Sequence, residues 1–125
     1  FITAPEISQL FGDILGIYIF YIWKKKYNTN FNLIELGPGN GSLLVDILKI
    51  TNNYKNVHKK FNIHLIETNK HLINIQKENL IKNNFNDLNI KWHKKLTNIS
   101  LLPSIIIGNE FLDCLPIKQF QKKKS

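Results

Sequence analysis

The spacing of apolar and polar positions changes several times along the chain and predicts three helices. Between residues 4 and 23, apolar side chains recur at helical spacing, which predicts a helix packed against a core. A second helix is predicted at 42–50, directly after a glycine-rich loop. A third helix is expected to begin at Thr68 or Asn69, either of which can cap it. The side chains that fall largely on one face of this third helix are Leu72, Ile73, Gln76, Leu80 and Ile81.

Four apolar runs, each bounded by polar or turn residues, predict strands. They lie at 31–36, 61–67, 88–93 and 104–108. The last run is so apolar that both of its faces are expected to be covered. Because helices and strands alternate, the chain predicts an α/β fold with a parallel sheet and helices on both sides.

The chain predicts one domain without internal repeats. Its 125 residues, 43% of them hydrophobic, are enough for one modest core. We expect a helical segment at 1–30 and the cofactor-binding half of a sheet at 31–120. The chain starts with Phe, and strand 104–108 would be an exposed edge if the sheet ended there. We therefore expect it to be a piece of a longer protein, with an incomplete sheet.

Three glycines at alternate positions, Gly37, Gly39 and Gly41, join the first strand to the following helix. Such a junction brings backbone N–H groups and a helix N-terminus up against a ligand. The spacing excludes the dinucleotide pattern G-x-G-x-x-G, because the sixth position is Ser42 from Gly37 and Leu44 from Gly39. A tight turn without a ligand is the alternative.

Two acids complete this first constellation. With Glu35, the loop reads E-x-G-x-G-x-G, which resembles the pattern of class I methyltransferases that use S-adenosylmethionine. Glu35 is expected to be an indirect partner of the methionyl ammonium, because a buried acid and a cationic ligand lower each other's cost of burial. Glu67 ends the second strand, where doubly wound folds hold the hydroxyls of a ligand ribose. The alternative for Glu67 is an ordinary helix-capping acid.

A second constellation, Asn109, Glu110 and Asp113, follows the most apolar strand. Ligands of open α/β sheets bind outside the carboxyl ends of the strands, so this segment is expected beside the glycine loop. Two carboxylates and an amide suit a cationic or amide-bearing methyl acceptor, and paired carboxylates would orient a guanidinium. The alternative is that Asn109 and Asp113 cap a turn or a helix. Cys114 is not expected to act as a nucleophile, because no histidine lies near it in the sequence.

The charge and composition of the chain limit the classes of partner that it is expected to bind. The net charge of +8 comes from lysine alone, without any arginine, and many asparagine and isoleucine residues suggest an A/T-rich genome. Because arginine is preferred for phosphate and base contacts, we predict no nucleic-acid partner.

The apolar run 14–23 is too short to span a bilayer, so no membrane insertion is expected. The single cysteine, Cys114, permits no internal disulfide and predicts a reducing compartment. The histidines His58, His64, His71 and His93 are scattered and predict no metal site.

Three segments carry a family resemblance: FITAPEISQLFG at 1–12, ELGPGNG at 35–41 and NEFLDCLPIKQF at 109–120. In this order the chain resembles the MidA-like family, which includes an arginine methyltransferase of mitochondrial complex I assembly. The resemblance implies a class I, Rossmann-like methyltransferase fold, S-adenosylmethionine as methyl donor and protein arginine as acceptor, with a respiratory complex I subunit as the partner. A/T-rich composition suggests a bacterial cytoplasm, whereas the family suggests a mitochondrial matrix.

Other functions remain open at this point. One alternative is an assembly or binding factor, or the product of a degraded gene, that keeps the fold without turnover. A nucleobase or glutamine-amide methyltransferase is disfavoured, because Glu110 and Phe111 stand where those enzymes have paired prolines after an asparagine. A dehydrogenase is disfavoured by the glycine spacing.

Overall fold

Helices and strands alternate along the chain, as predicted. The computed structural model describes residues 4–54, 56–109 and 121. The predicted helices at 4–23 and 42–50 are confirmed to within one residue at each end. The expectation that the apolar face of the first helix packs on a core is wrong for most of its length, since Ile7, Leu10 and Ile14 are each more than half exposed. The elements are α1 (Ala4–Ile22), a π-helical turn (Trp23–Tyr27), β1 (Phe31–Leu36), α2 (Ser42–Thr51), a 3-10 turn (Val57–Lys60), β2 (Phe61–Ile66), α3 (Lys70–Lys82), β3 (Ile90–His93), a 3-10 turn (Leu96–Asn98) and β4 (Ser104–Ile107).

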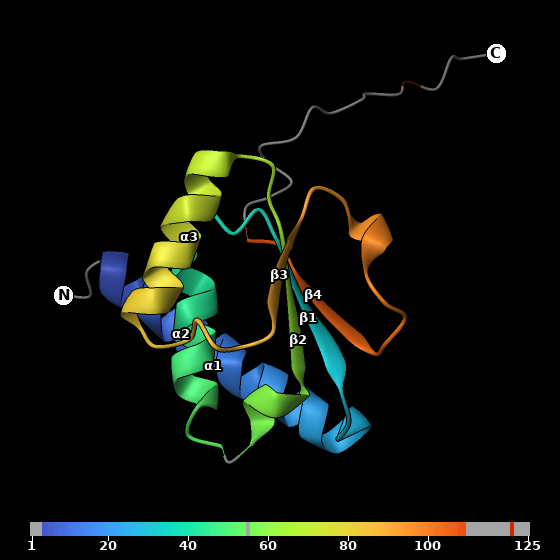
Figure 1. Ribbon diagram of the computed structural model, residues 1–125. Helices are drawn as coiled ribbons and strands as arrows, with labels where there is room; N and C mark the ends of the chain where they lie inside the picture. Colours follow the sequence, from blue (N-terminus) through green and yellow to red (C-terminus); the bar gives the residue numbers. More distant parts are fainter. Residues whose placement is uncertain (1–3, 55, 110–120, 122–125) are drawn as a thin grey trace.

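The four strands form one parallel sheet in the order β3-β2-β1-β4 (Figure 1). The chain runs outward from β1 through β2 to β3 and then returns to the other side of β1 as β4. This reversal places a topological switch between β1 and β4, which is where open α/β sheets bind ligands. Glu35 lies next to the switch, paired in register with Leu65 of β2 and Ile107 of β4.

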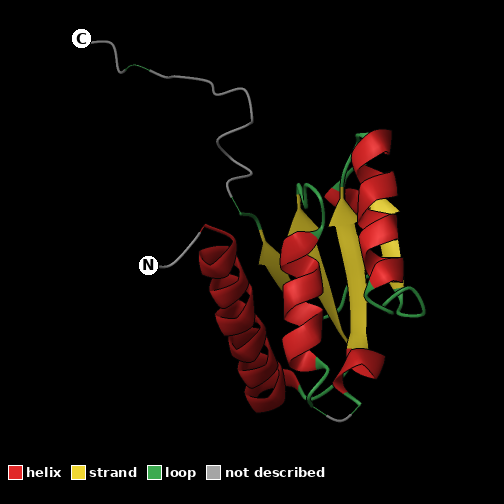
Figure 2. Ribbon diagram, turned by 90° about the vertical axis from the view of Figure 1, so that its left-hand side faces the viewer, coloured by secondary structure: helices red, strands yellow, loops and turns green. Residues whose placement is uncertain are grey.

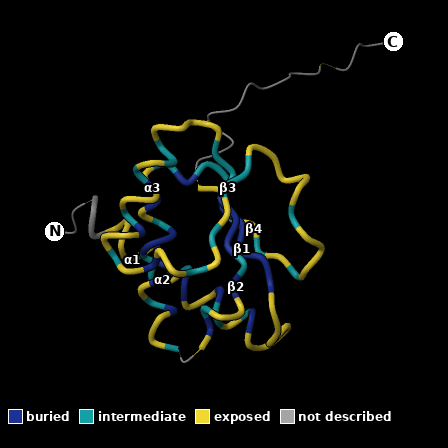
Figure 3. The backbone as a smooth tube through the Cα atoms, viewed as in Figure 1, coloured by how far each residue is buried: buried dark blue, intermediate teal, exposed yellow. Residues whose placement is uncertain are grey.

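The three described α-helices all lie on one face of the sheet (Figures 1 and 2). Phe31 and Leu33 of β1 point into this helix layer and join the buried core, which runs through β1 and β2 (Figure 3). The prediction of helices on both sides is therefore not met by the described residues. On the other face, Ile106 is 55% exposed. The expectation that both faces of 104–108 are covered is wrong for this reason.

Helix α1 crosses α2 closely through two glycines. A Cβ on Gly12 would lie 2.5 Å from the Cβ of Asp46, and one on Gly16 would collide with Ile50. Glycine at both positions lets the two helix backbones approach. The packing sets the beginning of α1 beside the beginning of α2. Within the described ranges, no helix has the length and apolar character needed to cross a membrane.

Candidate functional site

The glycine loop between β1 and α2 has the backbone shape that its spacing predicts. Gly37, Gly39 and Gly41 all have left-handed φ angles, at +60°, +57° and +84°. Glycine adopts this conformation without the steric cost that a Cβ brings. Among the hydrogen bonds of the described chain, none uses the N–H of Gly39 or Asn40. These donors therefore stay available at the N-terminus of α2, where a ligand can meet them.

Glu35 is the most unusual group of the site. Its side chain is 4% exposed, and its Oε2 atom has no hydrogen-bond partner within the described part of the chain. Burial raises the pKa of the Glu35 carboxyl from its ordinary value of 4.5 to about 7. A buried carboxylate oxygen without a partner is costly in a folded protein. A cationic ligand at this position would relieve that cost.

Glu67 directly follows the strand to which the loop is joined. The N–H of Gly37 donates to the carbonyl of Ile66, the last residue of β2, at 3.1 Å. Glu67 Oε1 accepts from the N–H groups of Thr68 and Asn69, at 3.0 Å each. The acid therefore caps the turn into α3, as its alternative predicted, and it also lies beside the loop. The predicted cap of α3 is Asn69, which accepts from two N–H groups of the first turn.

Asn109 lies two residues after β4, at a small cavity of about 280 Å³. The other walls come from the beginning of α1, at Ile7 and Phe11, and from the beginning of α2, at Ser42. This cavity brings together the first motif, the end of the glycine loop and the start of the third motif. The predicted site residues Glu110 and Asp113, together with Cys114, lie outside the described residues.

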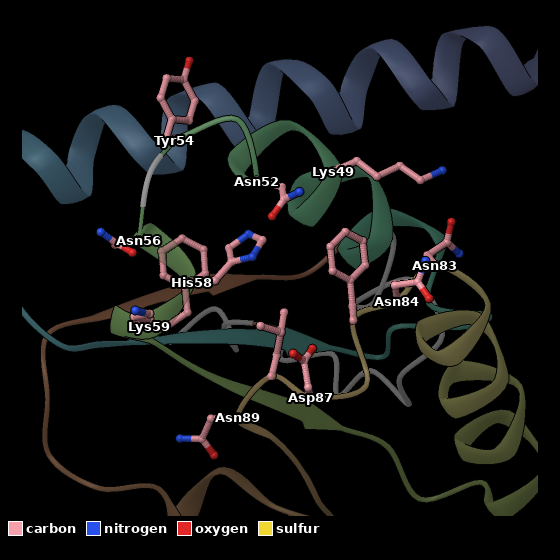
Figure 4. Close-up of a pocket in the computed structure, with 13 residues that line it drawn as sticks. Lys49, Asn52, Tyr54, Asn56, His58, Lys59, Asn83, Asn84, Asp87 and Asn89 are labelled. Atoms are coloured by element: carbon pink, nitrogen blue, oxygen red, sulfur yellow. The ribbon is translucent and has the colours of Figure 1, made fainter.

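A larger cavity lies elsewhere. It measures about 780 Å³ and lies near the amino end of β2, where Lys49, Tyr54, His58, Asp87 and Asn89 line it (Figure 4). Of the predicted site residues that the structure describes, none contributes to its walls. At least one of its polar side chains already has a hydrogen-bond partner, because His58 Nε2 lies 2.8 Å from the hydroxyl of Thr51.

Two histidines that are far apart in the sequence meet on the sheet face that the helices leave open. His64 Nδ1 and His93 Nε2 lie 2.8 Å apart, and His64 Nε2 lies 3.2 Å from Asn32 Oδ1. Burial lowers the pKa of His64, and the neighbouring His93 and Lys91 lower it further. In the described chain, no group of three or more potential metal-ligating side chains is found.

Sequence reasoning missed two residues that hold the glycine loop from behind and a third that holds one of them. Gln76 Nε2 donates to the carbonyl of Gly39 at 2.7 Å, and Asn79 Nδ2 donates to the carbonyl of Asn40 at 2.6 Å. Trp92 of β3 donates in turn to Gln76 at 2.8 Å. One signal was present, because Gln76 is a polar residue within the apolar face of its helix.

The residues of this site fit S-adenosylmethionine. The orphaned carboxylate of Glu35 suits an ammonium group, and the loop offers N–H donors beside it. Glu67 lies at the end of the adjacent strand, where a ribose is held in doubly wound folds. A plain structural turn would explain the left-handed glycines but not the buried oxygen.

Comparison with known proteins agrees with this fit. Residues 14–125 match the model of a family described as "Putative S-adenosyl-L-methionine-dependent methyltransferase". The chain is 36% identical, over an alignment 138 positions long, to the mitochondrial protein arginine methyltransferase NDUFAF7 homolog of Caenorhabditis elegans. It is 34% identical, over 142 residues, to the mitochondrial protein arginine methyltransferase NDUFAF7 of Homo sapiens. Both alignments cover 98% of the chain and 32% of the relative, so the chain spans about a third of these relatives.

A solved structure shows the same fold. An uncharacterized protein from Burkholderia thailandensis superimposes with a TM-score of 0.68 at 23% identity, over 89% of this chain and 28% of that protein. The parallel sheet, the glycine loop and the family match lead to one conclusion. The chain belongs to the MidA-like family of S-adenosyl-L-methionine-dependent methyltransferases that its three motifs predicted.

Proposed function

We propose that the protein containing this chain transfers a methyl group from S-adenosylmethionine to an arginine side chain of a protein. The observation that carries the proposal is the buried, unpartnered oxygen of Glu35 behind a loop of three left-handed glycines. The names of the relatives, protein arginine methyltransferases, support the choice of acceptor.

The cofactor would be held by the end of β1 and the end of β2. Glu35 would balance the charge of the methionyl ammonium, and the backbone from Gly37 through Gly39 to Gly41 would approach the methionyl part. Glu67 would accept hydrogen bonds from the ribose hydroxyls. When bound, S-adenosylmethionine supplies an electrophilic methyl group on a sulfonium.

The acceptor would be held by Asn109, Glu110 and Asp113. The two carboxylates would orient the planar guanidinium and accept the proton that its nitrogen loses. The place of Asn109 supports this assignment, because its cavity also includes Ser42 at the start of α2. Positioning of this kind is the main contribution that a protein makes to an in-line displacement.

A subunit of respiratory complex I in the mitochondrial matrix is the acceptor and setting that we propose. The support is the family resemblance together with the mitochondrial names of the relatives. The bacterial cytoplasm, suggested by composition, has no comparable support among these names. We keep the prediction that no nucleic acid is bound.

Calorimetric titration of the full-length protein with S-adenosylmethionine tests the cofactor site. We expect saturable binding that Glu67→Gln weakens by about tenfold, because a charge-assisted hydrogen bond contributes more than a neutral one. Glu78→Gln, which makes the same change at an exposed position of α3, is the control and should bind normally. No detectable binding at millimolar cofactor would refute the proposal.

Methyl transfer to arginine peptides tests the acceptor residues. Glu110→Gln and Asp113→Asn should abolish transfer, while the cofactor affinity stays within a few-fold of the unaltered protein. Asn109→Ala should raise the KM for the peptide. If cofactor affinity falls together with transfer, these residues are structural, and the proposed acceptor site is wrong.

A further inference from the structure

The side chain of Gln76 connects three elements that meet behind the glycine loop. It is fully buried, at 0% exposure, and comes from the middle of α3. Its Nε2 donates to the carbonyl of Gly39 at 2.7 Å, and its Oε1 accepts from Trp92 Nε1 at 2.8 Å. Helix α3, strand β3 and the loop are thereby joined through one amide.

The orientation of this amide is determined by chemistry. An indole N–H can only donate, so it must face the amide oxygen of Gln76. A backbone carbonyl can only accept, so Gly39 must face the amide NH₂. Trp92 therefore selects the one amide rotamer that can hold Gly39. Turning the amide over would break both hydrogen bonds at once, in a place that water does not reach.

The two sides of the loop differ. A Cβ on Gly41 would lie 3.3 Å from Gln76 Cγ, so the back of the loop packs tightly on Gln76. A Cβ on Gly39 would have no heavy atom of the described residues within 4 Å, apart from its own chain neighbours. The loop is thus supported from behind by α3 and open on the side where Gly39 would carry its side chain. Such a loop can be in its ligand-binding shape before the ligand arrives.

We propose that Gln76 is a positioning residue for the cofactor loop, held in its working rotamer by Trp92. It does not touch the cofactor. Instead it holds the Gly39 carbonyl toward α3, which directs the N–H of Asn40, in the same trans peptide unit, to the opposite side. Asn79 adds a second tie, to the carbonyl of Asn40. The inference rests on the proposed function, in which this loop binds S-adenosylmethionine.

Cofactor titration of full-length variants tests the role. Gln76→Leu should weaken binding of S-adenosylmethionine by about tenfold, because a buried carbonyl loses its donor. Trp92→Phe keeps an aromatic ring but releases the amide, and should weaken binding by about threefold. The double variant should bind no more weakly than Gln76→Leu alone, because Trp92 acts through Gln76. Binding by Gln76→Leu within twofold of the unaltered protein would overturn the proposal.

Gln76→Glu is the second variant, in case Gln76→Leu does not fold. A carboxylate can accept from Trp92 but cannot donate to Gly39, whereas a protonated carboxyl can do both. The loss of affinity, relative to the unaltered protein at the same pH, should therefore shrink as the pH is lowered. A merely structural role predicts a ratio that does not follow protonation, which would count against the proposal.

Leu80→Ala separates positioning from stability. Leu80 is buried one turn further along α3 and has no hydrogen bond to the loop, so this variant should lower Tm yet bind the cofactor normally. Equal weakening by Leu80→Ala would show that Gln76 is only structural.

A measurement without cofactor keeps this inference separate from the proposed function. Hydrogen exchange of the segment 37–43 should be at least several-fold faster in Gln76→Leu and unchanged in Leu80→Ala. If exchange changes as expected but the unaltered protein binds no cofactor, the proposed function fails and the loop support stands. If the protein binds cofactor and Gln76→Leu changes neither exchange nor affinity, the inference fails.

Discussion

The two ends of the parallel sheet differ in the volume of their cavities and in whether their polar groups have hydrogen-bond partners. The larger cavity, of about 780 Å³, lies near the amino end of β2, and the cavity beside the glycine loop measures about 280 Å³. At the amino end, His58 is paired with Thr51, and Asn89 donates to Asn62 at 2.6 Å. At the carboxyl end, Glu35 Oε2 is buried and has no hydrogen-bond partner among the described residues. The place where this fold can bind a charged ligand is therefore indicated by its unsatisfied polar groups and not by its cavity volumes.

The residues with left-handed φ angles also differ between the two ends of the sheet. Near the amino end they are asparagines, Asn56 and Asn84, whose side chains tolerate this conformation. At the carboxyl end they are glycines, and Gly39 has open space where a Cβ would be. Packing among the described residues does not require glycine at position 39. Its φ of +57° favours glycine, and the open side that glycine leaves suits the approach of a ligand.

The largest expected effect concerns the charge of Glu35. Its pKa is raised to about 7 in the folded protein, so its contribution to stability is fully present below pH 4.5 and is lost as the pH rises through 7. Glu35→Gln should remove this loss and stabilise the cofactor-free protein by up to about 3 kcal/mol at pH 8.5. Denaturant unfolding at pH 4.5 and pH 8.5 measures the difference. Equal pH dependence in both proteins would contradict a buried, unpaired acid.

The same carboxyl predicts the opposite trend for the ligand. An ammonium group needs the ionised form of Glu35, so the affinity for S-adenosylmethionine should increase as the pH rises to about 7 and then level off. Glu35→Gln should bind weakly at every pH. Titrations in buffers of different protonation enthalpy would show whether a proton is released on binding.

A smaller effect is expected when the open side of the loop is filled. Gly39→Asn should keep most of the stability, because asparagine tolerates a φ of +57°, but should weaken cofactor binding by tenfold or more. Gly41→Ala should instead affect mainly the stability. Its φ of +84° should cost about 1–2 kcal/mol, and the new Cβ would also crowd Gln76. Thermal unfolding and titration of both variants measure the two effects.

The matched control lies at the other end of the sheet. Asn56→Gly introduces the residue that adopts a φ of +64° most easily, and it should leave cofactor affinity unchanged. If Gly39→Asn bound the cofactor normally, the open side of the loop would not be the ligand side.

The smallest effect is expected at the large cavity itself. Thr51→Val removes the hydroxyl that lies 2.8 Å from His58 Nε2 and should cost about 1 kcal/mol of stability. Burial lowers the pKa of His58 below 6.5, so its contribution to stability is present above pH 6.5 and is lost on acidification. Methyl transfer and cofactor affinity should not change in this variant. A loss of activity at neutral pH would mean that the large cavity is functional.

The local pattern of the chain was enough to predict its elements and its family. Helical spacing located α1 and α2, and short apolar runs bounded by polar or turn residues located the strands. The glycine spacing excluded a dinucleotide site, and the acid at Glu35 indicated a cationic ligand. The side-chain cap of α3 at Asn69 was also predictable, because capping depends on neighbours within a few residues.

Other features depended on contacts between distant segments. Nothing local indicates that His64 meets His93, because their approach follows from the pairing of β2 with β3. The exposure of Ile106 follows from all three described α-helices packing on one face.

The sequence by itself determined where the helices and strands lie and which backbone positions lack a side chain. Only the tertiary structure decided what surrounds them: that Glu35 Oε2 finds no partner in the described part of the chain, and that Gln76 supports the loop from behind. The physical reason is that periodicity and turn chemistry act over a few residues. Desolvation of a carboxyl and the pairing of a buried amide depend instead on every element that packs around them.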